Sequence, residues 1–375
     1  LKRMLTETDL DFSCEIVEGL SISDLDEMAI GAFKQRWAQK SGRKDYISYS
    51  NDKILKAAGL LFDKGLNYAS LILFGKKEKI DELLPGSEII FEWRQDPLAV
   101  SHDFRKNWRE PFFAIYDDVW KAINDRNMRI PLQDGLFQRE IYAFNEKTVR
   151  EAFLNAIAHR DYTIKGRSVF IKASPKEFNI ESPGGFPLGI TAENILTKTF
   201  WRNRCIAETL EKAGLVERSG QGMDDIYGNT IREGKGLPDL SGSDTSSVLL
   251  KIPAQVKDKN FILFLEKIQN EREMIFSFEE ILELEKIRES QAVISPEFKK
   301  KFLSLGIIEK IGKTSGSKYI LSHKYYSFEK KAGVHTRLSG ISRDKQKELI
   351  IKHLEKNKKG LREEFQDIFP ELKPM

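Results

Sequence analysis

The stretch from residue 147 to residue 185 constrains the fold more than any other part of the chain. Residues 147–160 (KTVREAFLNAIAHR) place apolar side chains at 149, 153, 154 and 157, which is the spacing of a helix with one buried face. Asn145 stands before them as an N-cap. Segments 167–173 and 176–180 flank Ser174-Pro175 and predict a hairpin, and a Pro-Gly-Gly turn follows. This order of helix, hairpin and turn predicts an α+β domain.

The rest of the first 256 residues predicts mixed helices and strands. We expect helices through most of residues 1–60, with Ser23-Asp24 as the cap of one of them. The apolar runs 68–74 (YASLILF) and 88–93 (EIIFEW) predict strands, and 112–124 predicts a helix. Beyond the glycine turn we expect a short helix over 191–196, a helix over 204–213, a helix restarting at Gly222 and a strand over 248–252.

Residues 258–325 have the pattern of a separate small module. Helices are expected over 260–269, 278–284 and 296–305, and two short strands flank the turn 312–316. Three helices and a hairpin predict a winged helix. Residues 344–356 begin another helix of the same style, so we expect a second, incomplete winged helix. The predicted domains are therefore 1–128, 129–256, 257–328 and a last segment of linker and incomplete winged helix, 329–375.

The positive charge of the chain lies in its last third. The whole chain has 61 Lys and Arg against 57 Asp and Glu, a net charge of +4. From Asp258 onward the counts are 24 against 19, a net charge of +5. Such a local excess is a candidate nucleic-acid surface, and the alternative is an ordinary solvated face. We predict DNA as a partner, bound by Lys299, Lys300, Lys301, Lys310, Lys313 and Lys318.

The cysteine content and the hydropathy predict a cytoplasmic protein. The two cysteines, Cys14 and Cys205, belong to no CxxC motif, which argues against a zinc site and a disulfide framework and predicts free thiols in a reducing cytosol. No apolar run reaches the roughly 18 residues that span a bilayer, so no membrane association is expected. The chain begins with Leu1, as expected of an excised or processed chain.

Polar and glycine residues form an ordered set in the central domain. Glu151 and Asn155 lie one turn apart on the predicted helix and share a face. His159-Arg160-Asp161-Tyr162 follow, then Gly184-Gly185, and then Gly220-Gln221-Gly222.

This order resembles the GHKL ATP-binding fold of gyrase, heat-shock chaperone ATPases, MutL and histidine kinases. The segments EAFLNAIAHRDY, ESPGGFPLGIT and GLVERSGQGMDDI are more closely similar to bacterial proteins labelled RecG-like, transcriptional regulators with a Schlafen-type AlbA-like domain. The resemblance covers about residues 20–255 and is most specific over 141–235. It implies a Bergerat-like α/β sandwich over 129–256, preceded in 1–128 by the end of an AlbA-like segment and a family-specific subdomain.

The resemblance also implies an ATP site with Mg²⁺. Asn155 would hold the metal through the nucleotide, because Mg²⁺ prefers oxygen ligands, and Glu151 would be the catalytic base toward water. Glycines at 184, 185, 220 and 222 let the backbone approach phosphate or sugar closely. Arg160 and Asp161 either contact a phosphate or form a structural network at the helix end.

The chain departs from the family pattern at the adenine end. GHKL enzymes place an Asp two residues before the first glycine of the second motif, where it accepts a hydrogen bond from adenine. Here the corresponding residue is Glu181, and Pro183 replaces that glycine. The sequence therefore leaves ATP binding and hydrolysis open.

A second glycine motif points away from a helicase. Gly306 and Gly312-Lys313-Thr314 resemble a P-loop, but five residues separate the glycines where a P-loop has four, and a helix precedes them. We interpret this segment as the wing, and helicase activity is not expected. His102, His323, His335 and His353 are scattered and receive no role.

Three functions remain open from the sequence. The first is a DNA-binding transcriptional regulator in which the GHKL-like domain senses a nucleotide or serves as a dimerising scaffold. The second is a Mg²⁺-dependent ATPase. The third is a protein-interaction module with a vestigial pocket. A homodimer is expected by analogy with winged-helix regulators.

Overall fold

The structure is a computed structural model that describes residues 11–134, 137–198, 200–216, 221–289, 294–311 and 318–328, with positions 350, 351, 354, 359 and 360. The chain divides into two compact units. The first takes in residues up to 132, 138–230 and 237–255, and the second takes in 133–137, 231–236 and the residues from 256 onward. The predicted boundary between 128 and 129 therefore separates no compact units, because the N-terminal helices and the central strands share the first one.

The first unit is built on a mixed five-stranded sheet, which agrees with the predicted α+β class. Its strand order is β4-β3-β7-β8-β9. Neighbouring strands are antiparallel except for β3 and β7, which run parallel. The bounds are β3 (Ile89–Trp93), β4 (Phe104–Trp108), β7 (Val169–Ala173), β8 (Glu177–Pro183) and β9 (Ser247–Pro253).

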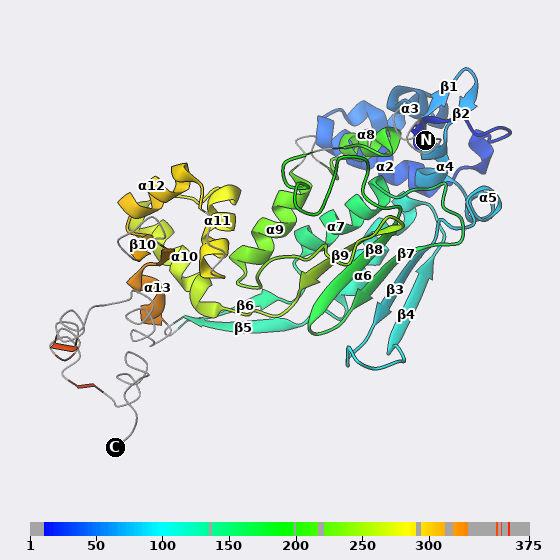
Figure 1. Ribbon diagram of the computed structural model, residues 1–375. Helices are drawn as coiled ribbons and strands as arrows, with labels where there is room; N and C mark the ends of the chain where they lie inside the picture. Colours follow the sequence, from blue (N-terminus) through cyan, green and yellow to red (C-terminus); the bar gives the residue numbers. More distant parts are fainter. Residues whose placement is uncertain are drawn as a thin grey trace. The chain divides into compact units, whose positions relative to one another are not determined.

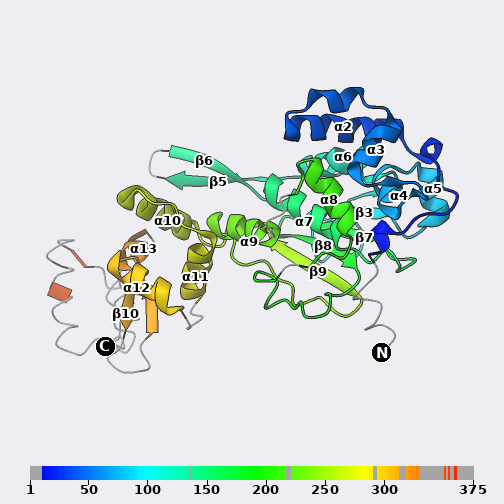
Figure 2. The same cartoon turned by 90° about the horizontal axis from the view of Figure 1, so that it is seen from above.

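The two faces of this sheet differ in chemistry because side chains alternate along each strand. On one face Phe91, Ile171 and Phe178 are fully buried. Helices α6 (Phe112–Asn124) and α7 (Glu146–Ala158) lie on that side (Figures 1 and 2). The opposite face is polar, and one row across it is Arg105, Glu92, Lys172, Asn179 and Lys251.

A second group of helices packs at one end of the first unit. Helix α8 lies beside α2 and α4, although it comes far later in the chain (Figures 1 and 2). The bounds are α2 (Glu27–Ser41), α3 (Asn51–Ala58), α4 (Tyr68–Phe74), α5 (Lys77–Leu83) and α8 (Arg204–Lys212), with the 3₁₀ segments η1 (Phe12–Cys14), η2 (Ile22–Asp24) and η3 (Lys44–Ser48).

Two sequence predictions of secondary structure were wrong. Residues 68–74 form α4 instead of a strand, and the side chain of Asn67 caps this helix by accepting a hydrogen bond from the Ser70 N–H at 3.0 Å. All of its residues from 69 to 74 are buried, and a helix buried on all sides has the same continuous apolar pattern as a buried strand. Residues 191–196 form turns instead of a helix, and the Asn194 side chain accepts from the Thr191 N–H.

The cysteine prediction was also wrong. Cys14 and Cys205 form a disulfide, with their Cα atoms 5.5 Å apart. They lie 191 residues apart, so no local spacing in the sequence indicated the bond. The fold brings them together because η1 packs against the start of α8.

The second unit contains the predicted three helices and hairpin. Its core holds Phe261, Phe264, Phe276 and Phe302, all essentially inaccessible to solvent. The hairpin pairs Ile308 with Leu321 in antiparallel register. The bounds are α10 (Lys259–Arg272), α11 (Phe278–Arg288), α12 (Pro296–Ser304), β10 (Ile308–Ile311), β11 (Lys318–Leu321) and α13 (His323–Phe328).

The remaining elements are short pairs and one helix. They are β1 (Leu61–Phe62), β2 (Gly65–Leu66), β5 (Arg129–Asp134), β6 (Phe137–Tyr142) and α9 (Gly222–Arg232). Nearly all of residues 329–375, predicted as a linker and the start of a second, incomplete winged helix, lies outside the described residues. In the part of the chain that the structure covers, we find no helix with the length and apolarity of a bilayer-spanning segment.

Candidate functional site

A cavity of about 150 Å³ lies in the first unit beside helix α7. Helix α7 contributes Glu151 and Asn155 to its lining, and its C-cap residue His159 lines it too. The helix begins where predicted, because Asn145 accepts a hydrogen bond from the Thr148 N–H at 3.2 Å. Other lining residues come from β8 and its glycine turn, from the loop after that turn, and from the start of α9.

Glu151 and Asn155 lie against the first residue of α9. A methyl group at Gly222 would stand 2.1 Å from Oε1 of Glu151 and 3.3 Å from Nδ2 of Asn155. Only a residue without a side chain therefore leaves room for this carboxylate and amide. The structure brings Glu151, Asn155, Gly184, Gly185 and Gly222 to one cavity. Gly220 lies outside the described residues.

The Gly184-Gly185 turn is tightly packed on its outer side. Gly184 has φ +98° and donates its N–H to the carbonyl of Ser246 at 2.8 Å. A methyl group at Gly185 would stand 2.6 Å from the carbonyl oxygen of Asp244. The neighbouring chain thus requires both glycines, and the Gly184 N–H already has a protein acceptor.

Strand β8 turns Ser182 toward the cavity and Glu181 away from it. Ser182 lines the cavity and donates its hydroxyl to the carbonyl of Ala156 at 2.8 Å. Glu181 accepts from Arg167 at 2.8 Å on the polar face of the sheet. Glu181, predicted at the adenine end of an ATP site, therefore lies outside the cavity lining. The alternation of side chains along a strand could have indicated this orientation, because apolar Phe178 and Ile180 share a face with Ser182 and not with Glu181.

Arg160 and Asp161, which were predicted either to contact a cofactor or to form a structural network, also lie outside the cavity lining. Arg160 is 2% exposed and donates to the carbonyls of Gly86 and Arg167, the latter at 2.7 Å. Burial lowers the pKa of its guanidinium. Asp161 accepts from the Thr163 N–H and hydroxyl. Both side chains support the structural alternative, a network at the end of α7.

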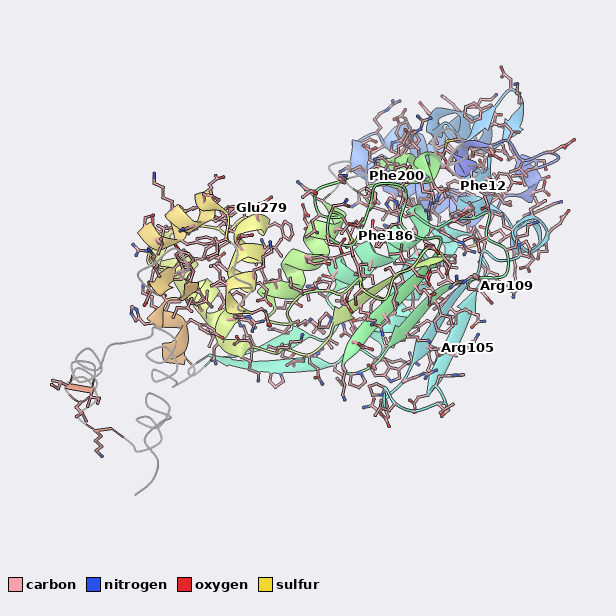
Figure 3. All side chains as sticks on the ribbon, in the orientation of Figure 1. Phe12, Arg105, Arg109, Phe186, Phe200 and Glu279 are labelled. Atoms are coloured by element: carbon pink, nitrogen blue, oxygen red, sulfur yellow. A yellow bond between two sulfur atoms is a disulfide. The ribbon has the colours of Figure 1, made fainter. Side chains whose placement is uncertain are left out.

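The loop between the glycine turn and α8 forms a wall of the cavity that the sequence did not predict. We call residues 186–198 and 200–203 the wall segment. Arg202 fixes one end of it by donating to the carbonyls of His159 at 2.9 Å and Gly185 at 2.7 Å. Asn203 donates to the carbonyls of Ala158 and Arg160 at 2.9 and 2.7 Å. Lining residues from this segment are Phe186, Pro187, Ile190, Ile195, Lys198, Phe200, Trp201 and Arg202, of which Phe186 and Phe200 are labelled in Figure 3.

The ring of His159 is held neutral at the cavity. It stacks on Trp201, with the ring centroids 5.9 Å apart. Burial, followed by the positive charge of Arg202, lowers the pKa of His159 to about 4. The imidazole therefore offers one donor and one acceptor at neutral pH without adding charge.

The lining combines apolar walls with a few charged groups. Glu151 supplies a carboxylate, Lys198 and Arg202 supply positive charge, and aromatic side chains supply flat apolar surface. Such a lining suits a ligand with a planar ring and an anionic part. The oxygens of Glu151 and Asn155 are also ligands of the kind that Mg²⁺ prefers, so the residues fit a metal held jointly with an anionic ligand. The volume is below the roughly 300–1,000 Å³ of typical ligand sites, so a large ligand requires movement of the wall segment.

The predicted DNA-binding lysines of the second unit are only partly available. Lys300 and Lys310 are exposed, whereas Lys301 forms an ion pair with the buried carboxylate of Glu280. The nitrogen of Lys299 lies 4.8 Å from the ring centre of Tyr319. Lys313 and the side chain of Lys318 lie outside the described residues.

The basic cluster also meets more acidic residues than the sequence indicated. Lys324 pairs with Glu271, whereas Glu309 accepts from His323. The acidic partners of Lys324 and Lys301 lie on helices α10 and α11. The sequence prediction considered only the charges of α12 and the hairpin, so it did not include them.

Comparisons with known proteins relate two parts of the chain to described domains. Residues 166–251 match a family model described as "Putative ATP-dependent DNA helicase recG C-terminal", which supports a RecG-like, ATPase-type domain here. Residues 2–90 match a domain of unknown function (DUF8451). No curated protein matches the chain.

One solved structure shares the fold over most of the chain. The DIP2311 protein from Corynebacterium diphtheriae superposes with a TM-score of 0.68 over 88% of this chain and 68% of its own, at 17% identity. At that identity the likeness concerns the fold alone. The central stretch of the chain is thus similar to a RecG-like ATPase-type domain, in a fold that a bacterial protein of known structure shares.

Proposed function

We propose that the first unit binds a purine nucleotide with Mg²⁺ and that the protein is a nucleotide-responsive DNA-binding regulator. One observation carries the nucleotide proposal: Glu151 and Asn155 lie against Gly222 in a cavity that Gly184 and Gly185 also line. The family match over 166–251 supports it independently. Lys198 and Arg202 provide positive charge for an anionic group, and the aromatic wall provides surface for a base.

Asn155 and Glu151 would have different roles at the phosphate end of the nucleotide. Mg²⁺, when bound with the nucleotide, neutralises phosphate charge. Asn155 offers its amide oxygen as a ligand, and Glu151 accepts a proton from an attacking water.

Calorimetric titration with a non-hydrolysable ATP analogue, with and without Mg²⁺, tests this proposal. We expect Mg²⁺-dependent binding that Asn155→Ala weakens by about tenfold or more, as for loss of a metal-contacting group. Glu146→Ala is a matched control, because Glu146 lies on the same helix, has a 57% exposed side chain and lies outside the cavity lining. No binding heat and no thermal shift at millimolar analogue would refute nucleotide binding.

We further propose that the second unit is a winged helix that contacts DNA. The three helices and the antiparallel hairpin support this fold, and exposed Lys300 and Lys310 support phosphate contacts. Because Lys301 and Lys324 already have acidic partners, we assign them little of the affinity.

Fluorescence anisotropy with duplex DNA at two salt concentrations tests the DNA contact. We expect affinity to fall steeply with salt, and the double variant Lys300→Glu, Lys310→Glu to bind more weakly with a salt slope reduced by about two. Lys324→Glu is the matched control and should change the slope little. Equal binding by wild type and the double variant would contradict the assignment.

The small cavity volume supports a second candidate, an interaction module whose pocket no longer opens. Arg202 donates to the carbonyl of His159 at the end of α7 and to the carbonyl of Gly185 in the glycine turn. These two hydrogen bonds would keep the cavity closed. The two candidates differ in one measurement, since only the first predicts saturable nucleotide binding.

A further inference from the structure

We infer that the Cys14–Cys205 disulfide is a redox-sensitive latch on the wall segment, so that reduction releases the wall and eases entry to the cavity. This inference concerns the regulation of the site proposed above and rests on that function for its ligand. Its structural part, release of the wall, stands independently of any ligand.

The latch lies directly beside the residues that close the cavity. Trp201 and Arg202 line the cavity, Asn203 binds the end of α7, and Cys205 follows two residues later in the first turn of α8. The position of α8 therefore sets the position of this end of the wall segment.

The first turn of α8 depends on contacts with the N-terminal segment. Asn203, its N-cap residue, makes no capping hydrogen bond with its side chain. The Arg204 N–H instead donates to the carboxylate of Asp11 at 2.6 Å. The disulfide and this hydrogen bond thus join the start of α8 to η1.

The other side of the latch is firmly anchored. The ring of Phe12 stacks on Tyr68 of α4 at a centroid distance of 4.2 Å, and Phe12 is labelled in Figure 3. The Tyr68 N–H donates to the carbonyl of Glu15 at 2.9 Å, and the Val17 N–H donates to Leu66 at 2.8 Å. The η1 side therefore stays in place on reduction, and this end of the wall segment is then held by the hydrogen bonds of Arg202 and Asn203 without the cross-link.

The chemistry is thiol–disulfide exchange with a dithiol reductant. One thiolate of the reductant attacks a cysteine sulfur, and its second thiol then displaces the mixed disulfide. The Cys14–Cys205 bond breaks, a disulfide forms within the reductant, and two electrons and two protons pass to Cys14 and Cys205. Cys14 is partly exposed, so a small reductant reaches the disulfide from that side. Asp11 Oδ2 lies 3.1 Å from the Cys14 sulfur and can accept from the resulting thiol.

Limited trypsin digestion of the full chain tests the latch without nucleotide. Lys198, Arg202 and Arg204 are trypsin sites at this end of the wall segment. We expect cleavage after them to be at least about fivefold faster with dithiothreitol than without it. Trypsin cuts chain that has opened locally, and after reduction the cross-link no longer restrains this opening. The double variant Cys14→Ser, Cys205→Ser should be cleaved at the fast rate in both buffers.

Equal cleavage of oxidised and reduced wild type would overturn the latch, as would two titratable thiols in protein purified without reductant. The analogue titration separates the two proposals. A tighter dissociation constant after reduction, by about threefold or more, supports regulation of the site. If oxidised and reduced protein are cleaved at different rates but neither binds the analogue, the latch is supported and the nucleotide site is refuted. Equal affinity in both states would refute regulation.

Discussion

At the scale of single residues, the cavity shows two glycines with different reasons for lacking a side chain. At Gly222 the nearest atoms to an added methyl group belong to the flexible Glu151 side chain. At Gly185 they belong to the backbone of Asp244 and Thr245. A side chain can rotate away at low cost, whereas backbone has to shift together with its hydrogen bonds.

The two alanine variants should therefore differ in kind. Gly185→Ala is expected to lower the free energy of unfolding by about 2–3 kcal/mol, which urea denaturation would measure. Gly222→Ala should change it by less than about 1 kcal/mol but displace the Glu151 carboxylate, lowering any ATP hydrolysis by about 100-fold. The reverse order of the two unfolding energies would contradict this account.

His159 gives the molecule a pH dependence of stability. Its folded-state pKa of about 4 lies below the ordinary value near 6.5, so the unfolded chain binds the proton more readily. The resulting stability is fully present above pH 6.5 and is lost as the pH falls toward 4. We expect wild type to lose about 1–3 kcal/mol more than His159→Asn across this window, measured by urea unfolding at several pH values. Parallel curves for the two proteins would show that the histidine is not responsible.

At the scale of elements, helix α8 takes its N-terminal hydrogen bond from a distant part of the chain. Asp11 accepts from Arg204 and also from the Ser13 N–H at 3.0 Å. A carboxylate in this position suits the positive end of a helix dipole.

Asp11→Ala should accordingly lower the free energy of unfolding by about 1–2 kcal/mol, and Asp11→Asn by clearly less, because the amide oxygen still accepts. Both variants are compared by thermal unfolding with the disulfide intact. Equal losses would mean that charge alone stabilises the helix. No loss for alanine would exclude the cap.

The sequence predicted elements well where one face was apolar and poorly elsewhere. The prediction of a helix over 112–124 matches α6, and the apolar stripe of α7 and the hairpin of β7 and β8 were also recognised. Strand β4 was missed because its FRKNW sequence has apolar residues only at its two ends, as an edge strand of the sheet allows. In the site, Glu151, Asn155 and the glycines followed from their order. Arg202 could not be predicted, because its role depends on carbonyls contributed by α7 and the glycine turn.

At the scale of the whole molecule, one sheet joins two regions that the sequence separates. Strands β3 and β4 precede residue 129, and β7, β8 and β9 follow it. Their apolar face shares helices α6 and α7, which also come from both sides of that position.

A fragment of residues 129–256 should therefore not fold by itself, because it lacks β3, β4 and α6 and leaves part of this apolar face uncovered. A fragment of residues 1–256 retains them and should show a cooperative thermal transition by circular dichroism. A cooperative transition of the shorter fragment would restore the boundary between 128 and 129.

The parallel pairing of β3 with β7 has a consequence for biosynthesis. Ile89 pairs with Val169, so a nascent chain that has left the ribosome only as far as α6 presents β3 with one of its long sides unpaired. Pairing of such distant segments is slow and leaves strand edges open in the meantime. Newly made molecules should therefore depend on holding chaperones until the β7 segment has been translated.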